Sequence, residues 1–69
     1  MALYFVFTGR GVCLREGTDE DTVREAVLRE VGTLDGVQDV RQATKADAVH
    51  IRAMGGRVPA SAYEKWDLL

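Results

Sequence analysis

Residues 3–7 (Leu-Tyr-Phe-Val-Phe) are apolar or aromatic without a break, and this run constrains the fold more than any other feature of the chain. A strand with one solvent-exposed face alternates apolar and polar residues, whereas an unbroken run is typical of a strand buried on both faces. A single helix covers only one face of a sheet, so we expect a second element to cover Tyr4 and Val6. The remaining apolar candidates lie in the C-terminal tail, either of the same chain or of a second copy: Tyr63, Trp66, Leu68 and Leu69.

A β-hairpin is expected at the N-terminus. Residues 3–8 form its first strand, and Val12 to Arg15, which alternate apolar and less apolar residues, form a shorter second strand. Between them lies Gly9-Arg10-Gly11, in which glycine on either side of one residue permits the positive φ values of a tight turn.

An amphipathic helix is expected from about residue 19 to 31. Thr18 is a good N-cap residue, and three acidic residues follow it at the positive end of the helix. Gly32 is the natural stop, because glycine adopts the left-handed C-cap conformation without a Cβ penalty. The apolar residues recur at spacings of three and four and form one stripe, which we expect to be core: Val23, Ala26, Val27, Val31 and Leu34.

Two further strands are expected at residues 37–43 and 48–54, joined around residues 44–47. In the second, Val49 and Ile51 alternate with His50 and Arg52, as in a half-buried strand.

The remaining residues are expected to form a flexible break and then a short terminal helix. Gly55-Gly56 marks the break, and Gly55-Gly56-Arg57 could also hold an anion with backbone amides and one guanidinium. Ser61 and Glu64 have the spacing of a capping box, which predicts one or two helical turns at the C-terminus.

The predicted order is therefore β-β-α-β-β followed by a short helix, an α+β fold in which a small antiparallel sheet packs on one main helix. The helix-to-strand return at residues 34–37 (Leu-Asp-Gly-Val) is similar in shape to that of ferredoxin-like α+β modules, and this resemblance implies their layering. Metal-carrying members of that class use paired cysteines before the helix, whereas Cys13 stands alone. We expect residues 1–58 to form one domain and residues 59–69 a short helical tail.

The length and the cysteine content restrict the class of protein. A chain of 69 residues makes one small domain that buries roughly 60% of its unfolded surface, so covering a further apolar patch by self-association is attractive. A single cysteine excludes a disulfide scaffold and fits a reducing compartment. The apolar N-terminus lacks the basic region and cleavage site of a secretory signal, and no window reaches the ~20 apolar residues of a membrane span. We expect a cytoplasmic protein.

No constellation of residues indicates catalysis, a cofactor or a metal. Gly9-x-Gly11 lacks the third glycine and the following helix of a dinucleotide loop. Cys13 and His50 could activate a thiolate, but no third orienting residue accompanies them. The acidic residues 19–21 are explained by their place at the start of a helix. We therefore expect a protein that is not an enzyme and that holds no cofactor and no metal.

The charge pattern points to binding instead. Residues 16–39 carry eight acidic residues and two arginines, whereas residues 40–57 carry four basic residues and one acidic residue. This pattern fits a solvated acidic helix with scattered basic strand residues, or a two-sided molecule with an acidic helix face and a basic sheet face. The candidate partner-binding residues are the basic residues of the sheet and its rim, together with two aromatic residues of the tail: Arg15, Arg41, His50, Arg52, Arg57, Tyr63 and Trp66.

Two functions fit these residues. The first is a small intracellular protein-binding module that acts as an inhibitor, adaptor or regulatory protein, of the type that phages and mobile elements encode; aromatic residues and arginine are favoured at such interfaces. The alternative is a nucleic-acid-binding module that uses the basic sheet face, although a pI of about 5.2 argues against it. We also expect a homodimer through the open sheet face and the tail.

Overall fold

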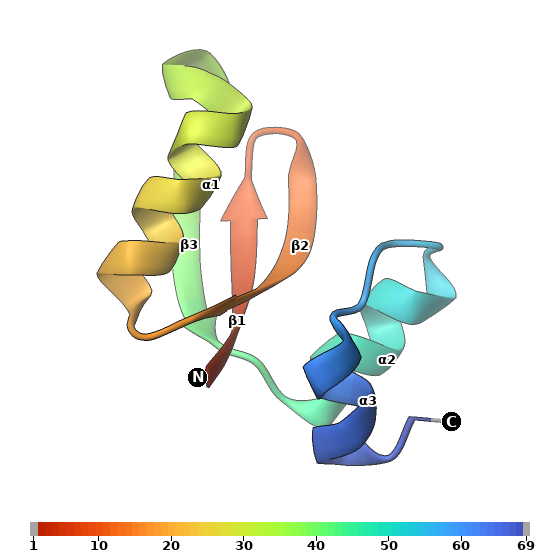
Figure 1. The fold of residues 1–69 in the computed structure, drawn as a ribbon. Helices are drawn as coiled ribbons and strands as arrows, with labels where there is room; N and C mark the ends of the chain where they lie inside the picture. The colour runs from red at the N-terminus through yellow and green to blue at the C-terminus, as the bar shows by residue number, and fades with distance from the viewer. Residues whose placement is uncertain (1, 69) are drawn as a thin grey trace.

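The computed structural model describes residues 2–68, apart from the side chains of residues 34 and 35, and it forms an α+β protein with a three-stranded antiparallel sheet and three helices (Figure 1). Its elements are, in order, β1 (Ala2–Thr8), β2 (Gly11–Gly17), α1 (Glu20–Asp35), β3 (Val37–Gln42), α2 (Lys45–Ala53) and α3 (Ala60–Trp66). β1 lies in the centre of the sheet and pairs antiparallel with β2 and with β3. The two edge strands consequently run parallel to each other.

The predicted hairpin is confirmed. Phe5 pairs with Leu14 and Thr8 pairs with Gly11 across the β1–β2 ladder. Gly11 has a φ of 129° at the turn, which is open to glycine but strained for other residues. The Thr8 hydroxyl donates to the Gly11 carbonyl at 2.9 Å and so closes the turn.

The predicted first helix is also present, with a different N-cap. Asp19, not Thr18, caps α1: its carboxylate accepts a hydrogen bond of 2.7 Å from the backbone N–H of Thr22. With Thr18 as the N-cap, the helix would begin at residue 19, but it begins at residue 20. Asp19 therefore occupies the N-cap position, and its side chain makes the capping bond. Gly32 breaks the helical geometry with a φ of 80°, as expected for the stop, before a last turn ends at Gly36.

The fourth predicted strand, residues 48–54, is wrong, because this segment belongs to helix α2. Thr44 and Asp47 form a capping box that starts the helix. Ala48 and Ile51, three residues apart, are buried on one side, while Val49 is 49% exposed. The element order is therefore β-β-α-β-α-α. The helix-to-strand return that resembles ferredoxin-like modules leads into a single strand, not a pair.

The short C-terminal helix is confirmed, although its predicted capping box is not formed. Pro59 occupies the N-cap position of α3, and within the described residues no side chain caps this helix. The Ser61 hydroxyl is instead buried and has no hydrogen-bond partner among those residues.

Both faces of the central strand are covered, as predicted: Leu3, Tyr4, Phe5 and Val6 are each at most 5% exposed. Successive residues of β1 point to opposite faces, so they belong to two separate clusters. On one face, Tyr4 and Val6 pack with Val23 and Val27 of α1 and with Val40. On the other face, Leu3, Phe5 and Leu14 pack with residues from α2 and from the C-terminal segment: Ala48, Ile51, Ala62 and Leu68.

The assignment of these faces corrects one expectation. The tail covers Leu3 and Phe5, and α1 covers Tyr4 and Val6. The cover of the second face comes from the same chain, with α2 contributing as well as the tail (Figure 1). The side chain of Leu34 in the predicted stripe, and the whole of Leu69, lie outside the described part of the chain. Across residues 2–68, none of the helices has the length and hydropathy needed to cross a bilayer.

Candidate functional site

The predicted basic sheet face is not assembled. Arg15 pairs with Tyr4 across the ladder and lies on the α1 side of the sheet. Arg41 pairs with Phe5 and lies on the opposite side. His50 and Arg52 belong to α2 and not to the sheet. Two causes separate the four residues. The register of β2 and β3 on β1 puts Arg15 and Arg41 on opposite faces, and residues 48–54 form a helix in place of the predicted strand.

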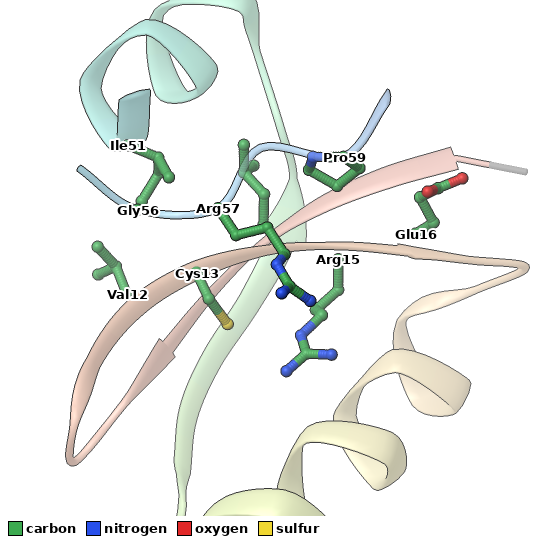
Figure 2. A pocket seen from close by; sticks show the side chains of 9 residues that line it. Val12, Cys13, Arg15, Glu16, Ile51, Gly56, Arg57 and Pro59 are labelled. Atoms are coloured by element: carbon green, nitrogen blue, oxygen red, sulfur yellow. The ribbon is translucent and has the colours of Figure 1, made fainter. Parts of the chain in front are cut away.

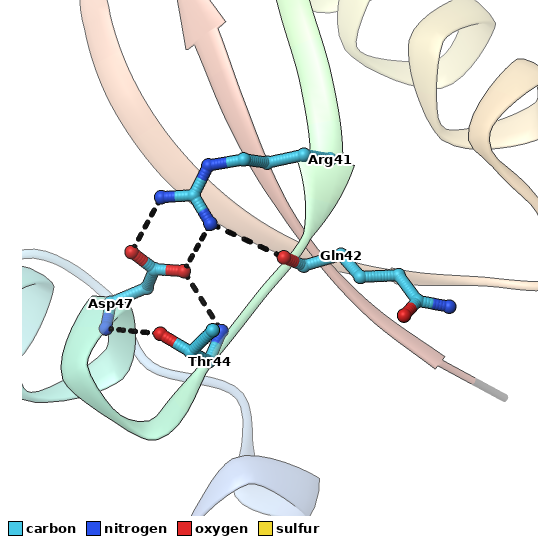
Figure 3. A network of polar contacts seen from close by, with 4 residues as sticks. All are labelled: Arg41, Gln42, Thr44 and Asp47. Carbon is cyan, nitrogen blue, oxygen red and sulfur yellow. Dashed lines mark hydrogen bonds and ion pairs between the residues drawn. The ribbon is translucent and has the colours of Figure 1, made fainter.

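Arg41 has a structural role at the junction between β3 and α2 (Figure 3). Its guanidinium donates to both carboxylate oxygens of Asp47, at 2.8 and 2.7 Å. It also lies over the ring of Phe5, 4.9 Å from the centroid. The hydrogen bond and charge of Arg41 hold the pKa of Asp47 below its usual value, against the opposing effect of burial, and bonds from Thr44 add to this lowering.

Arg52, Tyr63 and Trp66 also make contacts within the chain. The Arg52 guanidinium lies 5.6 Å from the centroid of the Tyr63 ring and donates a hydrogen bond to the Leu68 carbonyl. The ammonium of Lys65 lies 5.2 Å from the centroid of the Trp66 ring. Arg52 therefore ties α2 to the C-terminal segment, while both aromatic rings pack at the border of the core.

Arg15 and Arg57 lie together at the outer edge of β2. Figure 2 shows their side chains extending in the same direction past this strand, toward α1. Arg15 forms an ion pair with Glu30 of α1. Burial opposes its charge, but hydrogen bonds to Glu30 and Cys13 outweigh that effect and raise the pKa of the guanidinium. Arg57, which is exposed, makes no hydrogen bond or ion pair within the described part of the chain.

A cleft of about 390 Å³ separates the edge of β2 from the loop between α2 and α3. This volume is within the range of binding pockets, roughly 300–1,000 Å³. Its apolar lining comes from Val12 and Leu14 of β2, with Ile51 and Pro59 opposite. Arg15, Arg57 and Glu16 supply its charged groups, and Cys13 also lines it (Figure 2).

The α2–α3 loop is held close to α2 by its glycines. Gly55 has a φ of 79°, and a Cβ at Gly56 would lie only 2.8 Å from Cγ2 of Ile51. The backbone N–H of Gly56 donates to the Ile51 carbonyl at 2.9 Å. The predicted flexible break is therefore a tight turn, and it places Arg57 beside the edge of β2.

The two edges of the sheet differ. On β3, Asp39 accepts a hydrogen bond from the backbone N–H of Val40, and Arg41 donates to the Gln42 carbonyl, so side chains already engage backbone groups of this strand. A register shift also interrupts the β1–β3 ladder between Phe7 and Thr8. Such features protect an edge strand from pairing. The outer edge of β2, in contrast, has no backbone hydrogen bond to another segment within residues 2–68.

The arrangement of β2 is suited to binding a backbone. Alternate residues of an edge strand direct their N–H and C=O groups away from the sheet, where another extended chain can pair with them. A second hollow of about 180 Å³ shares Val12, Cys13 and Arg15 with the cleft and extends toward Val27 and Val31 of α1. Both sides of the β2 edge are therefore accessible.

Other chemistry has less support. His50 is exposed on α2 and does not line the cleft that contains Cys13. Among the described residues, no three metal-ligating side chains of His, Cys, Asp or Glu form a cluster. The sequence did not predict the cleft, because it lies between β2 and a loop more than forty residues further along the chain. The one sequence signal for it was the Gly55-Gly56-Arg57 motif.

Comparison with known proteins finds no family model, no curated protein and no solved structure that matches this chain.

Proposed function

We propose that the chain is a small protein-binding module without enzymatic activity, which receives an extended segment of a partner protein along the outer edge of β2. The observation that carries this proposal is the contrast between the open β2 edge and the β3 edge, whose backbone groups are engaged by side chains. Strand addition uses main-chain hydrogen bonds for affinity and neighbouring pockets for specificity. The cleft beside β2 supplies such a pocket.

Such a module acts as an adaptor, inhibitor or regulatory protein according to what its partner segment does when it is free. Of the seven residues expected to contact a partner, Arg15 and Arg57 lie at this edge and are retained in the proposal. The other five do not line the cleft: Arg41, Arg52, Tyr63 and Trp66 make contacts within the chain, and His50 is exposed on α2. The predicted homodimer, in which a second copy of the chain is the partner, is a separate prediction.

Selection of peptides from a random display library, with the folded chain as bait, tests the proposal. A selected peptide is expected to slow amide hydrogen exchange at residues 12–16, because the added strand accepts hydrogen bonds from the β2 edge. The amides of β3 serve as the internal control and should not change. Protection confined to β3 or to the helices would contradict the proposal.

Titration with a single-stranded oligonucleotide tests the nucleic-acid alternative. Phosphate contacts give an affinity that falls steeply as the salt concentration rises. The net charge of −2 and the separation of the predicted basic residues both favour the peptide. An oligonucleotide that binds with a steep salt dependence and displaces the selected peptide would reverse this preference.

A further inference from the structure

The two sides of the β2 edge differ chemically. Toward α2 and α3, the cleft presents apolar side chains, chiefly Leu14, Ile51 and Pro59. Toward α1, the edge presents Cys13 and the guanidinium groups of Arg15 and Arg57 (Figure 2). A strand added to this edge directs successive side chains alternately to one side and then to the other.

We infer that the segment that docks on β2 alternates apolar and acidic residues, with its apolar side chains against Leu14 and Ile51 and an acidic side chain against Arg57 and Arg15. This inference rests on the proposed function and names the chemistry of the partner. The cleft extends along residues 12–16 of β2. It therefore contacts roughly five residues of an extended chain at about 3.3 Å per residue.

The guanidinium of Arg57 is the main reason to expect an acidic side chain in the partner. Arg57 is exposed, has no hydrogen bond or ion pair among residues 2–68, and lies beside Arg15. Guanidinium donates hydrogen bonds in a planar fork that matches a carboxylate. The charge of Arg15 is already balanced by Glu30, so one carboxylate from the partner neutralises the remaining charge at this position. Glu16 lies on the same side of β2 as Leu14, so it disfavours an acidic residue on the apolar side of the edge.

Two other occupants are disfavoured, the first by charge and the second by its lack of strand-pairing groups. A second copy that paired through its own β2 would bring the Arg57 groups of both copies to one edge, and like charges across neighbouring strands are destabilising. A nucleic acid has no row of alternating N–H and C=O groups to pair with a strand edge. An acidic extended polypeptide satisfies both the backbone edge and the guanidinium.

Three capped seven-residue peptides test the inference. The first alternates valine and glutamate, the second replaces glutamate by glutamine, and the third has the composition of the first with its valines and glutamates in two blocks. Capped ends remove the terminal charges, so the side-chain carboxylates are the acidic groups tested. The first peptide is expected to bind at least about fivefold more tightly than each of the others, as for a partly exposed ion pair.

Charge reversal in the protein provides the second arm. Arg57→Glu should weaken binding of the glutamate peptide by about tenfold or more, and a lysine version of the peptide should recover affinity for this variant. The matched control is Arg29→Glu, which makes the same charge change at an exposed position of α1 away from the cleft. Arg57 is exposed and makes no hydrogen bond or ion pair among residues 2–68, so thermal melting should show the variant folded.

Each failure has a distinct signature. Peptides that protect residues 12–16 from exchange with equal affinity for glutamate and glutamine, or with no effect of Arg57→Glu, would overturn the inference and leave the proposed function. Equal losses with Arg57→Glu and Arg29→Glu would also overturn it, because the effect would then come from net charge. If the library yields no peptide that protects β2, the proposed function fails.

Discussion

Asp47 joins the start of α2 to strand β3 through its carboxylate. It accepts two hydrogen bonds from Arg41 of β3 and one of 2.8 Å from the backbone N–H of Thr44, at the start of α2. Its own backbone N–H donates to the Thr44 hydroxyl at 3.3 Å, which completes the capping box (Figure 3). The side chain of Asp47 is only 13% exposed, whereas that of Arg41 is 45% exposed. The pair therefore anchors the first turn of α2 to the end of the sheet.

This arrangement predicts a specific pH dependence. Because the fold lowers the pKa of Asp47, its ionised form stabilises the folded state. The contribution is complete above the unfolded value of about 3.9 and is lost as the pH falls through the folded pKa. Asp47→Asn should lower the urea midpoint at pH 7, and its difference from the parent should shrink below about pH 4.

Glu25→Gln is the control for this measurement, since it removes one carboxylate from an exposed position of α1. It should leave the urea midpoint at pH 7 nearly unchanged. A midpoint difference for Asp47→Asn that is independent of pH would show that the ion pair with Arg41 does not contribute.

Helix α2 shows how an element is selected when two patterns compete. Val49 and Ile51 lie on the same face of a strand, but on a helix two residues two positions apart point about 200° apart. Ile51 is 2% exposed and Val49 is 49% exposed, as helical geometry requires. The capping box at Thr44 and the bond from Arg41 favour the helix over the strand.

A pair of alanine substitutions distinguishes the two structures by stability. Ile51→Ala should cost about 2–4 kcal/mol, because it leaves a cavity in the cluster with Phe5 and Leu14. Val49→Ala should change the free energy of unfolding by less than about 0.5 kcal/mol, because that side chain is on the surface. Equal losses for the two variants in urea unfolding would support the strand and contradict α2.

Helix α1 packs on the sheet through a narrow apolar stripe. Val23 and Val27 are 2% and 1% exposed, respectively, and both pack on Tyr4, Val6 and Val40. Ala26, which the spacing predicts to be in the core stripe, is exposed, and the other residues between them face solvent or the margin of this contact. The stripe is therefore the part of α1 that is sensitive to charge.

Val27→Asp should abolish cooperative thermal unfolding, because an unpaired carboxylate would be buried against the sheet. Ala26→Asp is the matched control: it introduces the same charge at an exposed neighbouring position and should cost only a few tenths of a kcal/mol through helix propensity. A cooperative melt of Val27→Asp within a few degrees of the parent would show that α1 does not pack through this residue.

The molecule as a whole is a sheet between two helical layers, and its second layer includes the C-terminal segment. Ala62 and Leu68 share one cluster with Leu3 and Phe5, while Arg52 donates to the Leu68 carbonyl. The division of the chain into residues 1–58 and a separate tail remains a prediction, and so does the homodimer.

Truncation after Pro59 tests both the domain division and the homodimer. The shortened chain should lose most of its stability and self-associate, because removing Ala62 and Leu68 uncovers Leu3 and Phe5. Sedimentation and thermal melting at micromolar concentration would check this against the intact chain. A monomer as stable as the intact chain would show that residues 1–58 fold independently, and a dimer of the intact chain would confirm the predicted association.

Local sequence signals by themselves determined the doubly buried strand at residues 3–7, the hairpin at Gly11, helix α1 with its break at Gly32, and the short C-terminal helix. Each depends on a contiguous pattern or on the backbone freedom of one glycine, so neighbouring residues are sufficient to specify it. For the candidate site, the sequence predicted Arg15 and Arg57 as partner-binding residues. It also predicted five others that the fold places away from the cleft.

Tertiary structure decided the helical state of residues 45–53, the central place of β1, the face that each layer covers, and the cleft beside β2. Four alternating residues from Val49 to Arg52 fit either period. The Thr44–Asp47 capping box is a local signal for the helix, and the bond that ties Asp47 to the sheet comes from Arg41 on another element. The cleft exists because the turn at Gly55 and Gly56 returns Arg57 to a strand formed by residues 11–17. Neither contact leaves a periodic trace in the sequence. The Arg41–Asp47 pair spans six residues but crosses from a strand to a helix, and the cleft depends on where two distant segments meet once the apolar faces are buried.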